Sequence, residues 1–237
     1  TIPVGESIHL DLKVMPYESA AGVLAANQVF AIANCICRQQ KRLLDQGCTR
    51  PLETCLTFGT AAEHYIQSGR GRPITREEAA AILSAAEDAG LVLQPSNDRS
   101  PMNICMCCGC CCGVLVNLKR HPKPGTLVSS PFRAVMASDR CTSCGTCEQR
   151  CPMDAIQLVD GQTVLDSDRC IGCGLCVSTC PSGALTLSRR PAHEQFPVPA
   201  NVVRSYLRNG WALGKLGLPE LATMAFRSIV DRIRAPH

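Results

Sequence analysis

Residues 141–152 read CTSCGTCEQRCP, and residues 170–181 read CIGCGLCVSTCP. Both stretches follow the pattern Cys-x-x-Cys-x-x-Cys-x-x-x-Cys-Pro. The two Cys-x-x-Cys steps keep three thiols close together along the chain, whereas the x-x-x step before proline turns the fourth thiol away. The repeat therefore predicts a pair of similar metal sites, each of which takes its last cysteine from the other run.

This spacing is the one with which cysteine thiolates hold 4Fe–4S clusters, the fourth cysteine of each run binding the other cluster. Zinc ribbons also contain Cys-x-x-Cys pairs, but they do not use tandem runs of three cysteines plus one. Iron–sulfur is therefore favoured over zinc. The rule predicts one cluster on Cys141, Cys144, Cys147 and Cys180, and a second on Cys170, Cys173, Cys176 and Cys151.

On these two runs, residues 134–190 resemble the bacterial-type two-cluster ferredoxins. The resemblance implies a small α+β module with two short hairpins, two short helices and a pseudo-two-fold axis. Every ligand position of the motif is present. Because all-cysteine ligation leaves no open coordination position, these two clusters are expected only to pass electrons.

Cysteine is the anomaly of the composition, with 18 residues in 237. Disulfide scaffolds belong to short secreted chains, and a run such as Cys110-Cys111-Cys112 is awkward to pair geometrically. The cysteines therefore indicate metal ligands, a reducing, cytoplasmic location and an anaerobic physiology. No apolar stretch of 18 residues is present, so no membrane span is expected.

The formal net charge of +4 does not indicate a nucleic-acid partner. Each 4Fe–4S cluster with its thiolates adds about two negative charges, so two clusters bring the chain near neutrality. The lysines and arginines are scattered, without long runs or interleaved aromatic residues. Dinucleotide, P-loop and zinc-peptidase motifs are absent, so the sequence indicates neither nucleotide nor peptidase chemistry.

The fold class expected is α+β with three parts: a mostly helical cysteine-rich region at 1–122, a two-cluster module at 130–190, and a linker with C-terminal helices at 191–237. In the first part, Pro16 and the apolar spacing predict a helix over 17–34. A second helix is expected from Pro51 to residue 67. The capping box of Thr75 and Glu78 predicts a third over 76–89, and shorter elements are expected as a strand at 91–93 and a helix at 114–120.

Ten cysteines lie outside the two motif runs: Cys35, Cys37, Cys48, Cys55, Cys105, Cys107, Cys108, Cys110, Cys111 and Cys112. One interpretation is one or two further iron–sulfur clusters. The others are a structural zinc site, or a redox dithiol or metal-loading site. Two cubane clusters need eight thiolates, so the surplus permits a cluster of higher nuclearity or a free thiolate beside a cluster.

Adjacent cysteines such as Cys107 and Cys108 point their side chains apart, so they are expected to serve two different metal centres. The order of the cysteine groups resembles that of uncharacterised iron–sulfur proteins of anaerobes, a resemblance that implies architecture and no activity. Arg38 is a candidate either to hydrogen-bond an anionic cluster or to cap a helix. Met106 and Met153 are expected to shield clusters from water.

The C-terminal helix expected over 219–234 carries an apolar face formed by Leu221, Met224, Ala225, Ile229, Val230 and Ile233. We expect this face, together with Trp211, to pack back on the body. The alternative is that it docks a partner or a membrane surface.

The function expected is low-potential one-electron transfer by a multi-cluster iron–sulfur protein that serves a redox partner or a larger redox complex. One alternative is a reductase, with an unusual or open cluster at the N-terminal cysteines that the ferredoxin clusters supply with electrons. The other is an adaptor subunit whose N-terminal part is held together by zinc. Iron, zinc and sulfide content would separate the three.

Overall fold

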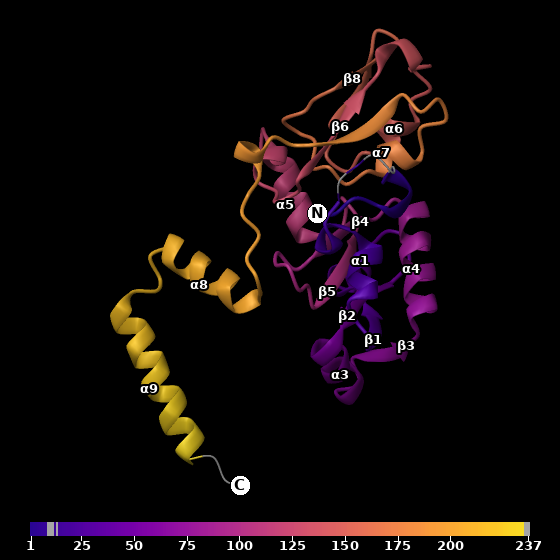
Figure 1. The fold of residues 1–237 in the computed structure, drawn as a ribbon. Helices are drawn as coiled ribbons and strands as arrows, with labels where there is room; N and C mark the ends of the chain where they lie inside the picture. Colours follow the sequence, from indigo (N-terminus) through magenta and orange to yellow (C-terminus); the bar gives the residue numbers. More distant parts are fainter. Residues whose placement is uncertain (9–11, 13, 235–237) are drawn as a thin grey trace.

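The structure is a computed structural model that describes residues 1–8, 12 and 14–234. A sheet with its helices forms the lower part of the molecule, and two short antiparallel strand pairs with two short helices form the upper part (Figure 1). The N-terminus lies between these parts, and the last two helices extend away to one side (Figure 1). The protein thus combines helices and sheets, as an α+β class requires.

An antiparallel five-stranded sheet of order β3-β1-β2-β5-β4 is the centre of the lower part. Its strands are β1 (Phe30–Asn34), β2 (Glu53–Phe58), β3 (Gly71–Ile74), β4 (Val92–Pro95) and β5 (Asn103–Cys107). This sheet corrects the expectation of a mostly helical region. Only the short strand near residues 91–93 was predicted, and it corresponds to β4.

Two predicted helices are wrong over part of their length. The stretch 17–34 contains the helix α1 (Ala20–Ala25) and then strand β1, four of whose five residues are buried. A continuous apolar run of this length is typical of a central strand covered on both faces. The stretch 51–67 contains β2 and then α3 (Gly59–Gln67), separated at Gly59, whose φ of 54° favours glycine.

Two of the other three helices of the lower part agree with the sequence, whereas the helix that follows Cys35 was not predicted. Helix α4 (Arg76–Asp88) begins at Thr75, whose side chain accepts a hydrogen bond from the Glu78 backbone N–H as the capping box predicted. Its buried residues Ala79, Leu83 and Ala86 pack toward β1 and β2. The remaining two helices are α2 (Ile36–Leu43) and α5 (Gly113–Arg120), the second near the predicted 114–120.

The upper part contains two antiparallel pairs of strands, one of them a hairpin, and two short helices. Strand β6 (Phe132–Met136) pairs with β9 (Leu185–Arg189), and β7 (Ile156–Val159) pairs with β8 (Gln162–Leu165), all antiparallel. The helices are α6 (Thr146–Arg150) and α7 (Leu175–Ser178). This arrangement agrees with the small α+β module that the resemblance implied.

The two parts share one hydrophobic core, which runs from the sheet into the upper part. The N-terminal segment contributes directly, because the Val4 backbone N–H bonds the Cys173 carbonyl at 3.1 Å and the Thr1 hydroxyl bonds the Ile171 carbonyl at 2.7 Å. Arg150 of α6 donates to the Glu87 and Asp88 carbonyls, both at 2.7 Å. Cations near the last carbonyls of a helix are favourable, so this contact stabilises the end of α4.

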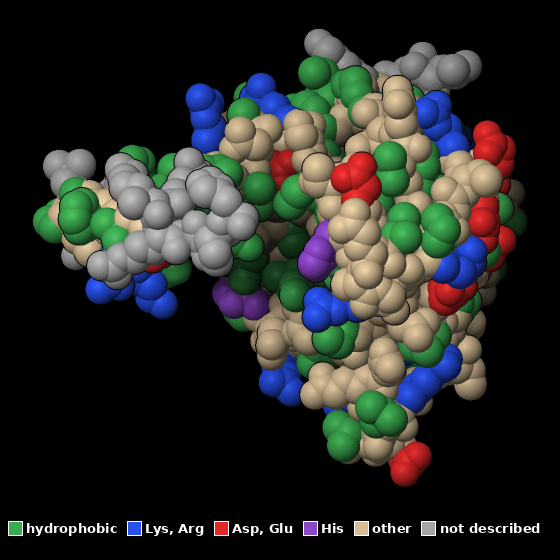
Figure 2. All heavy atoms as spheres, turned by 90° about the horizontal axis from the view of Figure 1, so that it is seen from below, with side chains coloured by type: hydrophobic (Ala, Val, Ile, Leu, Met, Phe, Trp, Pro, Cys, Tyr) green, Lys and Arg blue, Asp and Glu red, His purple; other side chains and the backbone are tan. Residues whose placement is uncertain are grey.

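The C-terminal helices form an arm that stands off the body. Helices α8 (Val202–Ala212) and α9 (Leu218–Arg234) extend from the linker after residue 190 (Figure 1). Figure 2 shows hydrophobic side chains on the surface of this arm. Trp211 is 55% exposed and Met224 is 59% exposed, so the expectation that they pack back on the body is wrong. Leu221, Ala225, Ile229 and Ile233 of the predicted apolar face lie outside the described side chains.

Short 3-10 helices connect these elements and are located at Gly5–Ser7, Pro16–Glu18, Pro124–Thr126, Ser138–Arg140 and Ala192–Glu194. In the part of the chain that the structure describes, no helix is both long enough and apolar enough to cross a bilayer.

Candidate metal centres

Two cavities in the upper part are lined by cysteines. The inner cavity is lined by Cys151, Cys170, Cys173 and Cys176 among others. The outer cavity is lined by Cys141, Cys144, Cys147 and Cys180 among others. Each cavity therefore takes three thiols from one run and one from the other, which is the division that the motif predicts.

The backbone positions the two cysteine sets in the same way. Gly145 and Gly174 precede helices α6 and α7 with φ angles of 75° and 80°, a left-handed conformation that glycine adopts without steric cost. The helices then direct Cys147 and Cys176 toward their cavities. Sequence spacing alone indicated this pseudo-symmetry, and the two glycines explain how the chain turns between the second and third cysteine of each run.

Backbone N–H groups point at the sulfur atoms. The Ala134 N–H donates to Cys170 Sγ at 3.3 Å, and the Ala155 N–H donates to Cys151 Sγ at 3.2 Å. Such bonds stabilise thiolates and tune the reduction potential of a cluster bound to them. Met153 is fully buried and lines the inner cavity, where its thioether excludes water. Four cysteines in each cavity form a donor set that fits a 4Fe–4S cluster, and in the inner cavity backbone N–H donors support two of them.

The two sets differ in their exposure to solvent. Cys170, Cys173 and Cys176 of the inner set are buried, whereas Cys144 of the outer set is exposed. Burial raises the pKa of the Cys173 thiol to about 12 and that of Cys176 well above its ordinary value. The Thr146 hydroxyl, by contrast, lowers the pKa of Cys144. The outer set therefore faces the surroundings, and the inner set faces the core.

The match to known proteins is confined to this part of the chain. Residues 140–185 match the 4Fe-4S dicluster domain family. No curated protein matches the chain. The dicluster domain includes all eight cysteines of the two motif runs, and a domain of this family indicates iron–sulfur electron transfer.

The ten remaining cysteines separate into two groups in space. Cys48, Cys108, Cys110 and Cys111, here called the four-thiol group, have sulfur atoms that all lie within 4.8 Å of one another. The other six, here called the six-thiol group, are Cys35, Cys37, Cys55, Cys105, Cys107 and Cys112. All 18 cysteines are free thiols, so the structure contains no disulfide among them.

The six-thiol group is built on one face of the sheet. Cys55 of β2 is paired with Cys105 of β5, so their side chains share a face. Cys107 lies two residues after Cys105 and thus on the same face, while Met106 between them is buried on the other. Cys112 precedes α5 and lies beside Cys107 and Cys37. Cys35 and Cys37 come from the start of α2.

Polar side chains support the six-thiol group at its edges. The Asn103 amide donates to Cys105 Sγ at 3.5 Å, and the Gln94 amide donates to Cys112 Sγ at 3.7 Å. Sequence reasoning missed both residues, because no spacing relates them to the cysteines. Asn103 lies on β5 and Gln94 on β4, and only the pairing of these two strands shows that both side chains lie beside the thiols.

Hydrogen bonds between neighbouring thiols set their protonation within the six-thiol group. Bonds from Cys107, Cys55 and Asn103 lower the pKa of Cys105 to about 3. A bond with Cys107 and backbone N–H groups of α5 lower the pKa of Cys112 to about 6. The bond to Cys105 raises the pKa of Cys107 and of Cys55. These bonds therefore favour ionisation of Cys105 and Cys112 over that of Cys55 and Cys107.

Arg38 is buried between the two groups. It donates to the Pro51 carbonyl, to the Thr54 hydroxyl at 2.7 Å and to the Met106 carbonyl at 3.1 Å. None of these acceptors is charged, and a buried charge is costly without a counter-charge. Despite burial, the pKa of Arg38 is raised by a hydrogen bond to Cys108 and by the charges of Cys108, Cys35 and Cys48. None of its three acceptors is a carbonyl at the end of a helix, so the predicted helix-capping role is wrong, and the bond to an anionic cluster stays a prediction.

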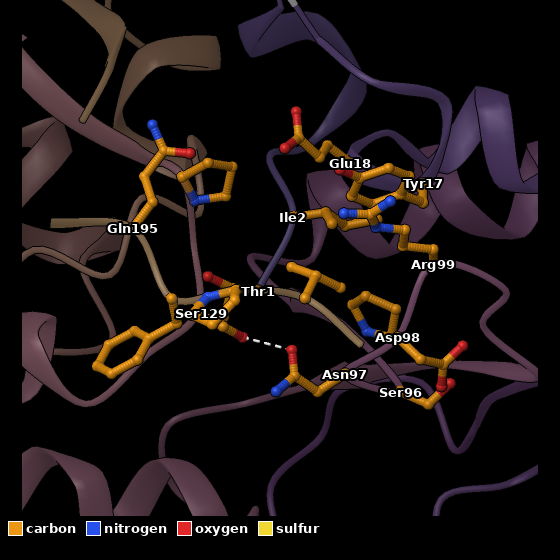
Figure 3. Close-up of a pocket in the computed structure, with 15 residues that line it drawn as sticks. Thr1, Ile2, Tyr17, Glu18, Ser96, Asn97, Asp98, Arg99, Ser129 and Gln195 are labelled. Atoms are coloured by element: carbon orange, nitrogen blue, oxygen red, sulfur yellow. Dashed lines mark hydrogen bonds between the residues drawn. The ribbon is translucent and has the colours of Figure 1, made fainter. Parts of the chain in front are cut away.

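A further cavity, of about 270 Å³, contains no thiol. Figure 3 shows Gln195 on one of its sides and Tyr17 with Arg99 on the other, with Thr1 between them. Ser129 donates a hydrogen bond to Asn97 at 2.7 Å at its edge. The Arg99 guanidinium lies 5.8 Å from the Tyr17 ring centre, which closes that side with a cation–π contact. This cavity shares no lining residue with the two cysteine cavities of the dicluster domain, although Thr1 on its wall bonds the carbonyl of Ile171, which lines the inner cavity.

Proposed function

We propose that this protein is a multi-cluster iron–sulfur protein that carries out low-potential one-electron transfer. The observation that carries the proposal is the pair of cavities in the dicluster domain, each lined by four cysteines. Cys141, Cys144, Cys147 and Cys180 would hold one 4Fe–4S cluster, and Cys151, Cys170, Cys173 and Cys176 the other. When bound, these clusters supply one-electron transfer; the protein supplies the ligands, the N–H donors and the exclusion of water.

The difference in exposure supports an orientation for the two sets. A redox partner would approach the outer set, because Cys144 is exposed there and electron transfer requires close approach. The inner set would lie on the route toward the N-terminal cysteines. A Cβ atom at Gly109 would be 3.2 Å from the Pro152 carbonyl oxygen, so the loop that carries the four-thiol group touches the residue after Cys151.

The six-thiol group supports a third iron–sulfur centre. Six thiols on one face of the sheet and the adjoining helix starts exceed the four ligands of an ordinary cubane cluster. This surplus also favours the second candidate function, a reductase in which an unusual or open cluster at these cysteines receives electrons from the dicluster domain. The six-thiol group gives less support to the zinc-held adaptor, because six thiols exceed the four ligands of a tetrahedral zinc site.

Reductive titration of protein purified without oxygen tests the proposal. The visible absorbance and the EPR spectrum are recorded at each potential, together with iron and acid-labile sulfide. We expect at least 8 Fe per chain from the dicluster domain, reduced in one-electron steps, and more iron from the six-thiol group. Colourless protein, or clusters that cannot be reduced, would refute electron transfer. Turnover of a small molecule with reduced protein would favour the reductase.

A further inference from the structure

The sulfur atoms of the four-thiol group are close together. Cys48 Sγ lies 3.7 Å from Cys111 Sγ and 3.9 Å from Cys108 Sγ, and the Sγ atoms of Cys110 and Cys111 are 3.8 Å apart. These separations are far longer than a disulfide bond. In a tetrahedral site with metal–sulfur bonds of about 2.3 Å, neighbouring sulfur atoms are about 3.8 Å apart. The group thus has the dimensions of a site for one ion.

A cubane cluster requires a wider arrangement, since its ligand sulfurs surround a core of four irons and four sulfides. The dicluster domain serves as the internal comparison. Across the described residues, which leave out 9–11, 13 and 235–237, the four-thiol group is the only set of metal-ligating side chains whose ligand atoms all lie this close together. The cysteines of the two dicluster cavities do not meet this condition, although their motif is that of cubane clusters.

The local backbone explains how three ligands come from four successive residues. The chain turns at Gly109 and Cys110, and the Cys112 backbone N–H bonds the Cys108 carbonyl at 3.2 Å. In this turn Cys110 and Cys111 converge, whereas the extended backbone at Cys107 and Cys108 separates their side chains. Cys48, in the loop after α2, supplies the fourth thiol. The expectation that adjacent cysteines point apart thus holds at Cys107 and Cys108 and not at Cys110 and Cys111.

The charges around the group fit a bound tetrathiolate. A divalent ion with four thiolates carries two negative charges. Arg38 lies beside Cys108 in the interior, and the Arg50 guanidinium donates to Cys110 Sγ at 3.7 Å from the solvent side. Two cations therefore face a site with a formal charge of two minus. The negative charge of the bound site would explain why Arg38 can be buried without a carboxylate partner.

We propose that Cys48, Cys108, Cys110 and Cys111 bind a single tetrahedral metal ion, zinc or iron, separate from every iron–sulfur cluster of the protein. The ion would join the loop after α2 to the turn before α5. This inference goes beyond the proposed function and does not depend on it, because a mononuclear site requires neither sulfide nor electron transfer. It leaves the six-thiol group as the place for the additional cluster.

The test compares Cys110→Ser with Cys37→Ser, which remove one thiol from each group, the first exposed and the second half-buried, in full-length protein purified without oxygen. Zinc, iron and acid-labile sulfide are measured per chain. We expect Cys110→Ser to lose one ion of zinc or iron with sulfide unchanged, and Cys37→Ser to lose iron together with sulfide. The identity of the lost element distinguishes zinc from iron.

Loss of several irons with an equal amount of sulfide from Cys110→Ser would overturn the proposal, because that ratio indicates a cubane cluster. Wild-type protein in which all the metal is iron, with an equal amount of sulfide, would also overturn the proposal. X-ray absorption of the wild type covers the case in which Cys110→Ser does not fold. A zinc edge with four sulfurs at about 2.3 Å and no neighbouring metal supports the site, as does iron in excess of sulfide by one ion. Protein with the ion but no sulfide would refute the proposed function and leave this inference intact.

Discussion

Gly145 and Gly174 offer a matched pair of substitutions in the dicluster domain. Both precede a short helix with nearly the same left-handed φ, at 75° and 80°. A Cβ atom at Gly145 would have no neighbour within 4 Å, whereas one at Gly174 would lie 2.1 Å from Ser7 Oγ and 2.7 Å from Ser7 Cβ. The two positions therefore share the conformational cost of alanine and differ in the contact with the N-terminal segment.

The size of the difference follows from these distances. A left-handed conformation costs an alanine about 1–2 kcal/mol, and this cost applies to Gly145→Ala and Gly174→Ala alike. Forcing an extra carbon into a packed site costs about 1–3 kcal/mol more, and it applies to Gly174→Ala alone. For a chain of this size, each kcal/mol lowers the unfolding midpoint by about 2–4 °C. Gly174→Ala should therefore unfold about 2–12 °C below Gly145→Ala.

The measurement is anaerobic thermal unfolding at a fixed scan rate, followed by the loss of cluster absorbance and by circular dichroism. Ser7→Gly combined with Gly174→Ala removes the atoms that the new carbon meets, so it should bring the midpoint back toward that of Gly145→Ala. Equal midpoints for the two single variants would refute the reasoning. Failure of the double variant to recover, with Ser7→Gly alone near wild type, would show that Ser7 is not the obstacle.

Burial raises the pKa of Glu87 above its ordinary value of 4.5, so its contribution to stability is greatest below that pH and is lost as the pH rises through the folded-state value. Glu87→Gln should therefore unfold at a higher temperature than wild type at pH 7, and the difference between the two unfolding midpoints should shrink toward acid pH. A difference in midpoint that does not depend on pH would contradict this. Arg150→Met removes two hydrogen bonds to the end of α4 and should cost about 1–3 kcal/mol, with faster amide exchange at Leu91, while Arg72→Met at an exposed ion pair serves as the control. Truncation after residue 201 removes α8 and α9, which stand off the body, so the midpoint should change by less than about 2 °C; a larger fall would show that the arm stabilises the body.

The dicluster domain was predictable because its motif is local. Three cysteines of each ligand set are related by spacings of two residues, and the fourth comes from the other run, which repeats the same local pattern. The same holds for α4, whose start is determined by Thr75 and Glu78 within one turn. Where a structural element depends on contacts within a few residues, the sequence alone was sufficient to predict it.

The five-stranded sheet was not predictable in this way. The run FAIAN over Phe30–Asn34 contains alanines that suit a helix as well as a strand, and its choice depends on pairing with β2 and β3. The division of the ten cysteines depends on the same pairing. Only the register of Cys55 opposite Cys105 shows that these thiols share a face, and only the turn at Gly109 brings Cys110 toward Cys48.

The shared core has a consequence for how electrons can leave the molecule. Some redox proteins carry their cofactor on a tethered module that travels between donor and acceptor. Here the first seven residues lie between the sheet and the dicluster domain, and Ser7 is in contact with Gly174. On another side, Arg150 donates hydrogen bonds to the end of α4. The cysteine sets are thus held at fixed separations, and the dicluster domain is not built to travel relative to the sheet.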